Sequence, residues 1–243
     1  MIRQPIKAPE TTVILGRRRV VLTRLDPDLW RVRFEADTGE VLESRLVLTD
    51  LEGFDLVALP DYLDLPVLLR FEEPLKVPAD VRSELYTLLP VQYEILVETR
   101  GHRILLGTLA PMDLQTSWEG PPTEGELAYY FQAPLFRTLQ ADRVPAGTVA
   151  LPLEIRNVSG QEQQLDHLMV DSYQLSLYDL DGILVAEVVE VHLDPHGTEI
   201  RYTDRPPSRQ AKEIRRGLEN VRKRGLARLT SRTLKSLVFR ELI

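Results

Sequence analysis

Three residues near the end of a predicted strand have the types and spacing of metal ligands. His192, Asp194 and His196 lie two residues apart in the sequence HLDPH. Side chains at that spacing share one face of a strand, and imidazole and carboxylate groups bind zinc and related ions. Pro195 indicates instead that the strand ends in a turn. The sequence favours the turn over a metal site, and no cofactor is predicted. If the chain does bind a metal, these three residues are the candidate ligands.

Other familiar catalytic and binding motifs are missing. The sequence DLDG, residues 179–182, resembles the start of a calcium loop, but the apolar residues that follow it predict a hairpin turn. No glycine pair has the spacing of a dinucleotide fingerprint, and no Gly-Lys pair indicates a P-loop. There is no Gly-x-Ser-x-Gly elbow and no cysteine. A hydrolase is therefore unsupported, and thiolate chemistry is excluded.

Charge is distributed unevenly along the chain. The 243 residues have a formal net charge of −7, but residues 201–243 hold 13 Lys and Arg against 4 Asp and Glu. That segment has a net charge of +9, which leaves −16 for residues 1–200. This asymmetry is more informative than the total net charge, because it predicts that the basic segment contacts an acidic surface.

The basic segment has the periodicity of an amphipathic helix. Ser208 is a candidate N-cap, and apolar residues follow at spacings of three and four. The sequence therefore predicts C-terminal amphipathic helices. Apolar and basic side chains are the predicted interaction residues: Ile214, Arg215, Arg216, Leu218, Val221, Arg222, Lys223, Arg224 and Leu229.

The ligand of this segment is open on sequence grounds. Docking on the acidic body, on a second subunit or on another protein would use both the apolar stripe and the cations. Nucleic acid or an anionic membrane surface could bind the same cations through residues 208–240. The stripe lacks aromatic residues, which weakens the membrane interpretation.

Before residue 200 the dominant pattern is the alternation of β-strands. Residues 29–35 and 41–48 alternate around the turn DTGE and predict a hairpin, as do 91–98 and 103–110 around Gly101. Residues 147–157 predict a strand that ends at the sequence NVSG, and residues 173–194 predict a third hairpin with its turn at Asp181-Gly182.

These elements predict a mostly β protein of two β-rich, antiparallel, sandwich-like parts followed by C-terminal helices. The predicted limits are residues 1–111 for the first part and 126–204 for the second, with a linker or long loop at 112–125 and the basic tail at 205–243. No stretch of about 18 apolar residues is present, so no transmembrane segment is expected. The absence of cysteine and of a signal peptide predicts a cytoplasmic protein.

Four segments resemble one family of uncharacterised prokaryotic proteins, Domain of Unknown Function family 432. They are LYTLLPVQYEILV, GELAYYFQAPLF, LPLEIRNVSGQEQQLDHLMV and YQLSLYDLDGILVAEVVEV, which span about half the chain from Leu85. The resemblance rests on turns and aromatic residues, and implies no activity or site residue.

The sequence thus predicts a non-enzymatic accessory or interaction protein whose basic tail docks on an acidic surface. The alternative is a hydrolase-like or metal-dependent enzyme with a site between the two β parts. Binding of nucleic acid or an anionic membrane surface is the third hypothesis.

Overall fold

The chain folds almost entirely into β-strands. The computed structural model describes residues 2–99, 102–121 and 123–217. Within these residues there is no α-helix, only two short 3-10 turns, η1 (Ala141–Arg143) and η2 (Ser172–Gln174). The prediction of a mostly β protein is confirmed.

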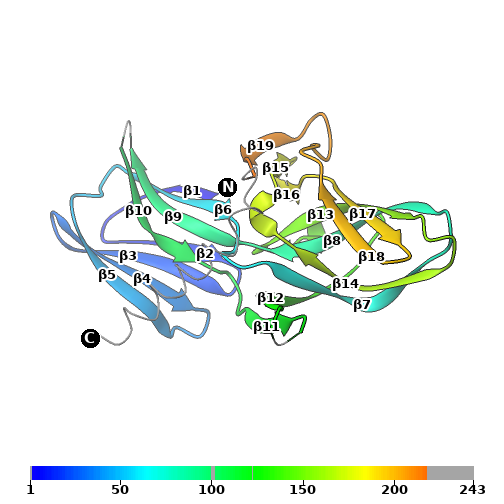
Figure 1. Ribbon diagram of the computed structural model, residues 1–243. Helices are drawn as coiled ribbons and strands as arrows, with labels where there is room; N and C mark the ends of the chain where they lie inside the picture. Colours follow the sequence, from blue (N-terminus) through cyan, green and yellow to red (C-terminus); the bar gives the residue numbers. More distant parts are fainter. Residues whose placement is uncertain (1, 100–101, 122, 218–243) are drawn as a thin grey trace.

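Two four-stranded antiparallel sheets form one end of the molecule (Figure 1). The first has the order β1-β6-β9-β10: β1 (Ile2–Pro5), β6 (Asp55–Asp61), β9 (Gln92–Thr99) and β10 (His102–Leu109). The second has the order β2-β3-β4-β5: β2 (Glu10–Leu15), β3 (Arg18–Asp26), β4 (Leu29–Ala36) and β5 (Val41–Leu48). Because Gly107 of β10 lies directly against the ring of Phe34 of β4, the two sheets face one another.

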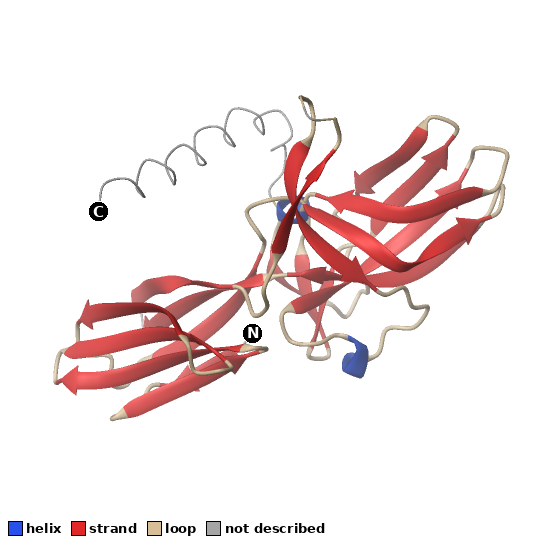
Figure 2. Ribbon diagram, turned by 90° about the horizontal axis from the view of Figure 1, so that it is seen from below, coloured by secondary structure: helices blue, strands red, loops and turns tan. Residues whose placement is uncertain are grey.

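The opposite end contains the remaining strands (Figures 1 and 2). One sheet has the order β11-β12-β7-β14: β7 (Val67–Val77), β11 (Gln115–Glu119), β12 (Glu126–Ala133) and β14 (Gln163–Val170). A larger sheet has the order β18-β17-β13-β16-β15-β19, with β8 also paired to β13. Its strands are β8 (Arg82–Pro90), β13 (Thr148–Asn157), β15 (Leu177–Leu180), β16 (Ile183–Ala186), β17 (Val189–Asp194), β18 (Gly197–Tyr202) and β19 (Lys212–Arg215).

Pairing within this second group is not purely antiparallel. Strand β12 runs parallel to β7, and both β16 and β17 run parallel to β13. Parallel neighbours need long crossover connections rather than tight turns. Local sequence patterns do not report such connections, so only the antiparallel pairs were predicted.

The predicted hairpins are confirmed. Strand β4 pairs with β5, β9 with β10, and β15 with β16. The last of these turns at Asp181 and Gly182, whose φ angles are +53° and +85°. Both residues adopt the left-handed conformation that a two-residue hairpin turn requires.

The predicted C-terminal helix is wrong for residues 208–217. Lys212–Arg215 instead form β19, which pairs antiparallel with β15. The free edge of β15 offers hydrogen bonds that outweigh a modest local helix preference. The other residues of the predicted stripe and basic face, Leu218, Val221, Arg222, Lys223, Arg224 and Leu229, lie outside the described residues.

The strands pair in two groups that do not follow the predicted limits 1–111 and 126–204. As domain boundaries, those limits stay a prediction. Strands β7 and β8 precede residue 111, yet they pair with β12, β13 and β14 of the second group. The chain therefore passes between the two groups three times, at residues 62–66, at Val91 and at 110–114. The predicted linker, 112–125, contains β11.

Close contacts of Pro111 hold the two groups together. Its carbonyl accepts a hydrogen bond from Arg17 N at 3.0 Å, and its ring lies against Gly16 and Gly147. A Cβ at Gly147 would stand 2.7 Å from Pro111 Cβ, and the φ of Gly147 is +91°. Glycine is therefore required there on both steric and conformational grounds.

Candidate interaction site around Arg215

Within the described part of the basic segment, β19 forms an edge strand at the junction of the two strand groups. In β19, Arg215 lies opposite Leu177 of β15. Two residues later, Gly217 N donates a hydrogen bond of 3.1 Å to the buried Ser176 Oγ. A Cβ at Gly217 would lie only 2.1 Å from the Gln174 carbonyl oxygen, so the backbone passes very close to the body here. Residues 212–217 are consequently part of the folded body, although none of them is buried.

The side chain of Arg215 contacts acidic residues of the other strand group. Its Nη1 forms a close ion pair with Asp61 Oδ1 and lies 4.0 Å from Glu94 Oε2. The guanidinium also lies over the ring of Tyr62, 5.4 Å from the ring centroid. Asp61 is held in place because Tyr62 N donates to the same Oδ1 at 2.6 Å. One cation of the basic segment is therefore docked on acidic residues of the protein's own body.

Beneath Arg215 the site is buried and polar. Tyr62 is only 5% exposed, and its hydroxyl has no hydrogen-bond partner among the described residues. Burial raises the pKa of Tyr62 well above its ordinary value, and the nearby Arg215 cation offsets part of that effect. The phenol therefore stays neutral and presents an apolar ring face to the guanidinium.

Glu187 lies near the Tyr62 ring and separates strands β16 and β17. Strands β16 and β17 follow the same edge of β13, and Glu187 lies in the gap between them. Its fully buried carboxylate accepts hydrogen bonds from Ser176 N at 2.9 Å and from Asp204 N at 3.1 Å. Burial raises the pKa of Glu187, although these backbone hydrogen bonds act in the opposite direction. The residue satisfies backbone groups that the sheet leaves unpaired.

The acidic residues around Arg215 continue along one face of the β6–β9 pair. Asp55 lies opposite Glu98, and Leu59 lies opposite Glu94, on the same face, with the buried pair Val57 and Leu96 between them. The far end of this row is already neutralised, because Glu98 pairs with both Arg3 and Arg103. The near end is the pair Asp61 and Glu94, whose described cationic partner is Arg215.

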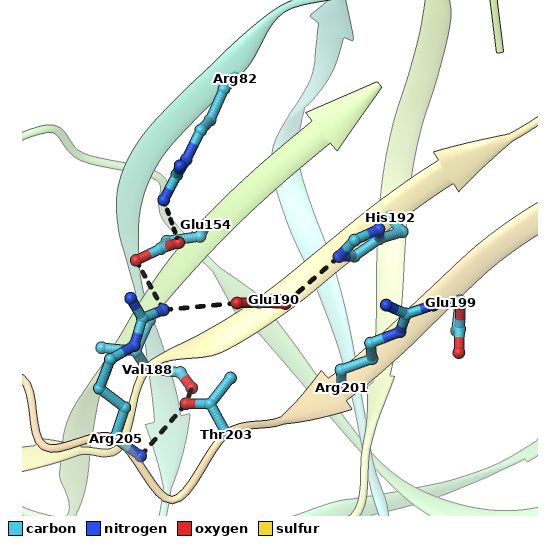
Figure 3. Close-up of polar contacts among 9 residues, drawn as sticks. All are labelled: Arg82, Glu154, Val188, Glu190, His192, Glu199, Arg201, Thr203 and Arg205. Carbon is cyan, nitrogen blue, oxygen red and sulfur yellow. Dashed lines mark hydrogen bonds and ion pairs between the residues drawn. The ribbon is translucent and has the colours of Figure 1, made fainter. Parts of the chain in front are cut away.

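A second cluster of charges covers the larger sheet (Figure 3). Glu154 of β13 accepts hydrogen bonds from Arg82 at 2.6 Å and from Arg205 at 2.7 Å. Arg205 also lies 3.6 Å from Glu190. Burial alone would raise the pKa of Glu154, but the two arginines outweigh it and lower that pKa. Beside the cluster is a small depression of about 90 Å³, lined by the pairs Arg82–Glu154 and Glu190–His192 and by Arg156.

The predicted turn in HLDPH is confirmed. Asp194 ends β17, and its Oδ1 accepts hydrogen bonds from His196 N at 2.6 Å and Gly197 N at 2.9 Å. His192 Nε2 lies 3.4 Å from Glu190 Oε2 instead. No group of three or more His, Asp or Glu side chains within residues 2–99, 102–121 and 123–217 is placed to hold a metal ion.

A larger depression, of about 320 Å³, lies between the two strand groups. Its lining is mixed: the apolar residues include Leu42, Leu63 and Met112, and polar residues lie among them. Its polar groups bind one another or the protein: Arg18 pairs with Asp113, Gln92 Nε2 donates to the Tyr62 carbonyl, and the Tyr129 hydroxyl donates to Asp64 Oδ1 at 2.9 Å. The predicted alternative, an enzymatic site between the two β parts, stays a prediction.

Comparison with protein families assigns the chain. A family model described as "Protein of unknown function (DUF432)" matches residues 4–236. The chain belongs to the DUF432 family. Neither the curated proteins nor the solved structures contain a match to this DUF432 chain. The family covers the N-terminal strands and most of the basic segment as well as the four segments that carried the resemblance.

The structure of the DUF432 chain describes three of the predicted interaction residues. Arg215 is docked as above, Ile214 is half-buried in β19, and Arg216 is exposed. The acidic partners Asp61 and Glu94 were not predicted, because they lie about 120 to 150 residues earlier in the sequence. Within the described residues, no helix is long and apolar enough to cross a membrane.

Proposed function

We propose that the protein is a non-enzymatic interaction module whose basic C-terminal segment docks on an acidic surface. The observation that carries this proposal is the contact of Arg215 with Asp61 and Glu94. Arg215 of the basic segment thus contacts the acidic body, and seven further Lys and Arg residues follow within residues 218–243. Opposite charges at close range favour further contacts between these cations and acidic residues of the body.

The five lysines of the chain make this docking measurable. Two of them, Lys223 and Lys235, lie in residues 218–243. A carbodiimide joins a lysine amine to a carboxylate only when the two groups touch. In the full chain at low salt, we expect Lys223 or Lys235 to cross-link to Asp61, Glu94 or neighbouring acidic residues of β6 and β9. Cross-linked monomer and cross-linked dimer, separated before mass spectrometry, distinguish docking within a chain from docking between copies.

Salt and two matched variants provide the controls. Screening at about 1 M salt shortens the Debye length to about 3 Å and should remove most of these cross-links. Glu94→Gln should reduce them, whereas Glu72→Gln, at an exposed position of β7, should not. If neither lysine cross-links to acidic residues of the body or of a second copy at low salt, docking on the protein itself is refuted.

A second set of variants tests the cations directly. The triple variant Arg222→Glu, Lys223→Glu and Arg224→Glu reverses the predicted basic face. We expect it to abolish the remaining Lys235 cross-links. The matched control reverses three exposed arginines of the body with the same change in net charge: Arg31, Arg70 and Arg137. Equal loss in both variants would show that net charge, and not the basic segment, governs the contact.

A ligand-binding or enzymatic role is the second candidate function, and the 320 Å³ depression between the strand groups favours it. A small organic molecule could contact Leu63 and Met112 there. Metal analysis of protein purified without an affinity tag tests the metal-dependent form of this hypothesis. A stoichiometric metal would place the enzymatic role first.

A further inference from the structure

Strand β5 is an unprotected sheet edge. It pairs with β4 alone among the described strands, and seven of its eight residues are exposed. Its outer edge therefore presents backbone N–H and C=O groups that no described strand pairs. Such an edge is a template for a further strand.

Strand β5 lacks some of the features that usually block association, although it carries the charged residues Glu43 and Arg45 and one irregularity. Proline and lysine on edge strands hinder pairing, and so do bulges and short length. Strand β1 has four residues and contains Pro5, and β10 has a bulge at Leu105/Gly107. Strand β5 has eight residues, no proline and no lysine. Its one irregularity, opposite Phe34/Glu35, lies near its N-terminal end.

Four of the seven exposed side chains of β5 are apolar. Leu46 is 63% exposed and Leu48 is 77% exposed. Their side chains share one face of the strand, because they are two residues apart. Leu42, 45% exposed, lies at the irregularity. A large apolar surface beside an open strand edge is a characteristic of interaction sites.

The sequence of β5, VLESRLVL, is complementary to itself when two copies run antiparallel. With Ser44 opposite Ser44 of the second copy, each Glu43 lies opposite Arg45 of the second copy, and each Leu42 lies opposite Leu46. Opposite charges and apolar pairs at directly opposed positions stabilise antiparallel strands. In the single chain, Glu43 and Arg45 pair with each other, so both side chains are already held on the same face.

We propose that two copies of this chain associate through antiparallel pairing of their β5 strands. The two sheets β2-β3-β4-β5 then join into one sheet across a two-fold axis that passes through Ser44. A two-fold interface of this kind needs a patch that is complementary to itself, which VLESRLVL provides. This surface is separate from Arg215 and its acidic partners, so the proposal goes beyond docking of the basic segment.

The molar mass of the full chain, measured by analytical ultracentrifugation over a range of concentrations, tests the proposal. We expect a reversible dimer. Leu46→Lys combined with Leu48→Lys should weaken the dimer tenfold or more, because it places four cations at one interface. Ile14→Lys is the matched control, since Ile14 is 71% exposed on the opposite edge strand of the same sheet. It should leave the dimer unchanged.

Charge reversal tests the register. Glu43→Arg places arginines opposite one another, and Arg45→Glu places glutamates opposite one another, so each single variant should dimerise weakly. An equimolar mixture of the two variants restores opposite charges at every pair and should form a heterodimer. Circular dichroism of each variant verifies folding, because Arg45 also donates to the Leu106 carbonyl at 2.7 Å.

Two results would overturn the proposal. One is a chain that stays monomeric at its highest soluble concentration, both natively and with Arg222, Lys223 and Arg224 changed to glutamate. The triple variant shows whether the basic segment itself blocks the edge. The other is a dimer whose affinity is unchanged by lysine at positions 46 and 48.

Discussion

A single arginine side chain joins the two strand groups at the level of individual residues. Arg215 comes from the second group, and its partners Asp61, Tyr62 and Glu94 lie in or beside strands of the first. The sequence identified Arg215 as an interaction residue from charge alone. It could not identify the partners, because acidic residues are numerous and their proximity depends on the fold.

Replacing Arg215 should loosen this junction. We expect Arg215→Ala to lower the free energy of unfolding by about 1–2 kcal/mol, since it removes one ion pair and one cation–π contact. Arg216→Ala, at the exposed neighbouring position, should change it by less than about 0.5 kcal/mol. Urea denaturation of both variants measures the difference. Equal effects would contradict the assigned contact.

The buried Glu187 carboxyl predicts a pH dependence of stability. Its pKa is raised in the folded state, so the folded protein binds this proton more tightly than the unfolded chain does. Glu187 therefore costs stability as pH rises above its ordinary value of 4.5. Glu187→Gln does not titrate, so wild-type stability minus variant stability should fall as pH increases. A difference that is constant from about pH 4 to 8 would contradict the prediction.

At the level of elements, Asn157 holds the end of β13. Its buried side-chain amide donates to the carbonyls of Val77 at 2.8 Å, Pro78 at 3.1 Å and Gln161 at 2.8 Å. Its Oδ1 accepts from Ser159 N at 3.0 Å. The sequence NVSG predicted the end of this strand, but the link to β7 requires residues 80 positions apart.

Changing the amide to a carboxylate should be costly there. Asn157→Asp places a buried charge against three carbonyl oxygens, so we expect a loss of about 3–5 kcal/mol in unfolding free energy. Ser159→Ala removes only the hydroxyl contacts and should cost about 1 kcal/mol. Chemical denaturation at neutral pH measures both. A smaller loss for Asn157→Asp than for Ser159→Ala would show that the amide is not essential.

The hairpins and the basic segment show what local sequence can and cannot predict. Alternating residues and the Asp181-Gly182 turn lie within one stretch of chain, so β15 and β16 were predictable. Residues 212–215 belong to a stretch with helical spacing, and the free edge of β15 pairs them as a strand instead. That edge is created by distant parts of the chain, so a local helix preference gave the wrong answer.

On the scale of the whole molecule, the two strand groups should unfold together. They share the contacts of Pro111 and Arg215, and three connections join them. Trp30 is fully buried in the first group, and Trp118 lies half-exposed in β11 of the second. In the Trp118→Phe variant, Trp30 fluorescence and far-ultraviolet circular dichroism should give the same denaturation midpoint. Separate midpoints would show that the groups unfold independently.

Because the chain passes three times between its two ends, its gene cannot be divided into two parts that each encode a complete strand group. A gene cut anywhere in residues 112–125 would give one product with β7 and β8 but without their partners, and another with the partners alone. Neither fragment could be recombined into an unrelated protein as a ready-made folding unit. The two ends can therefore be transferred to another protein only together.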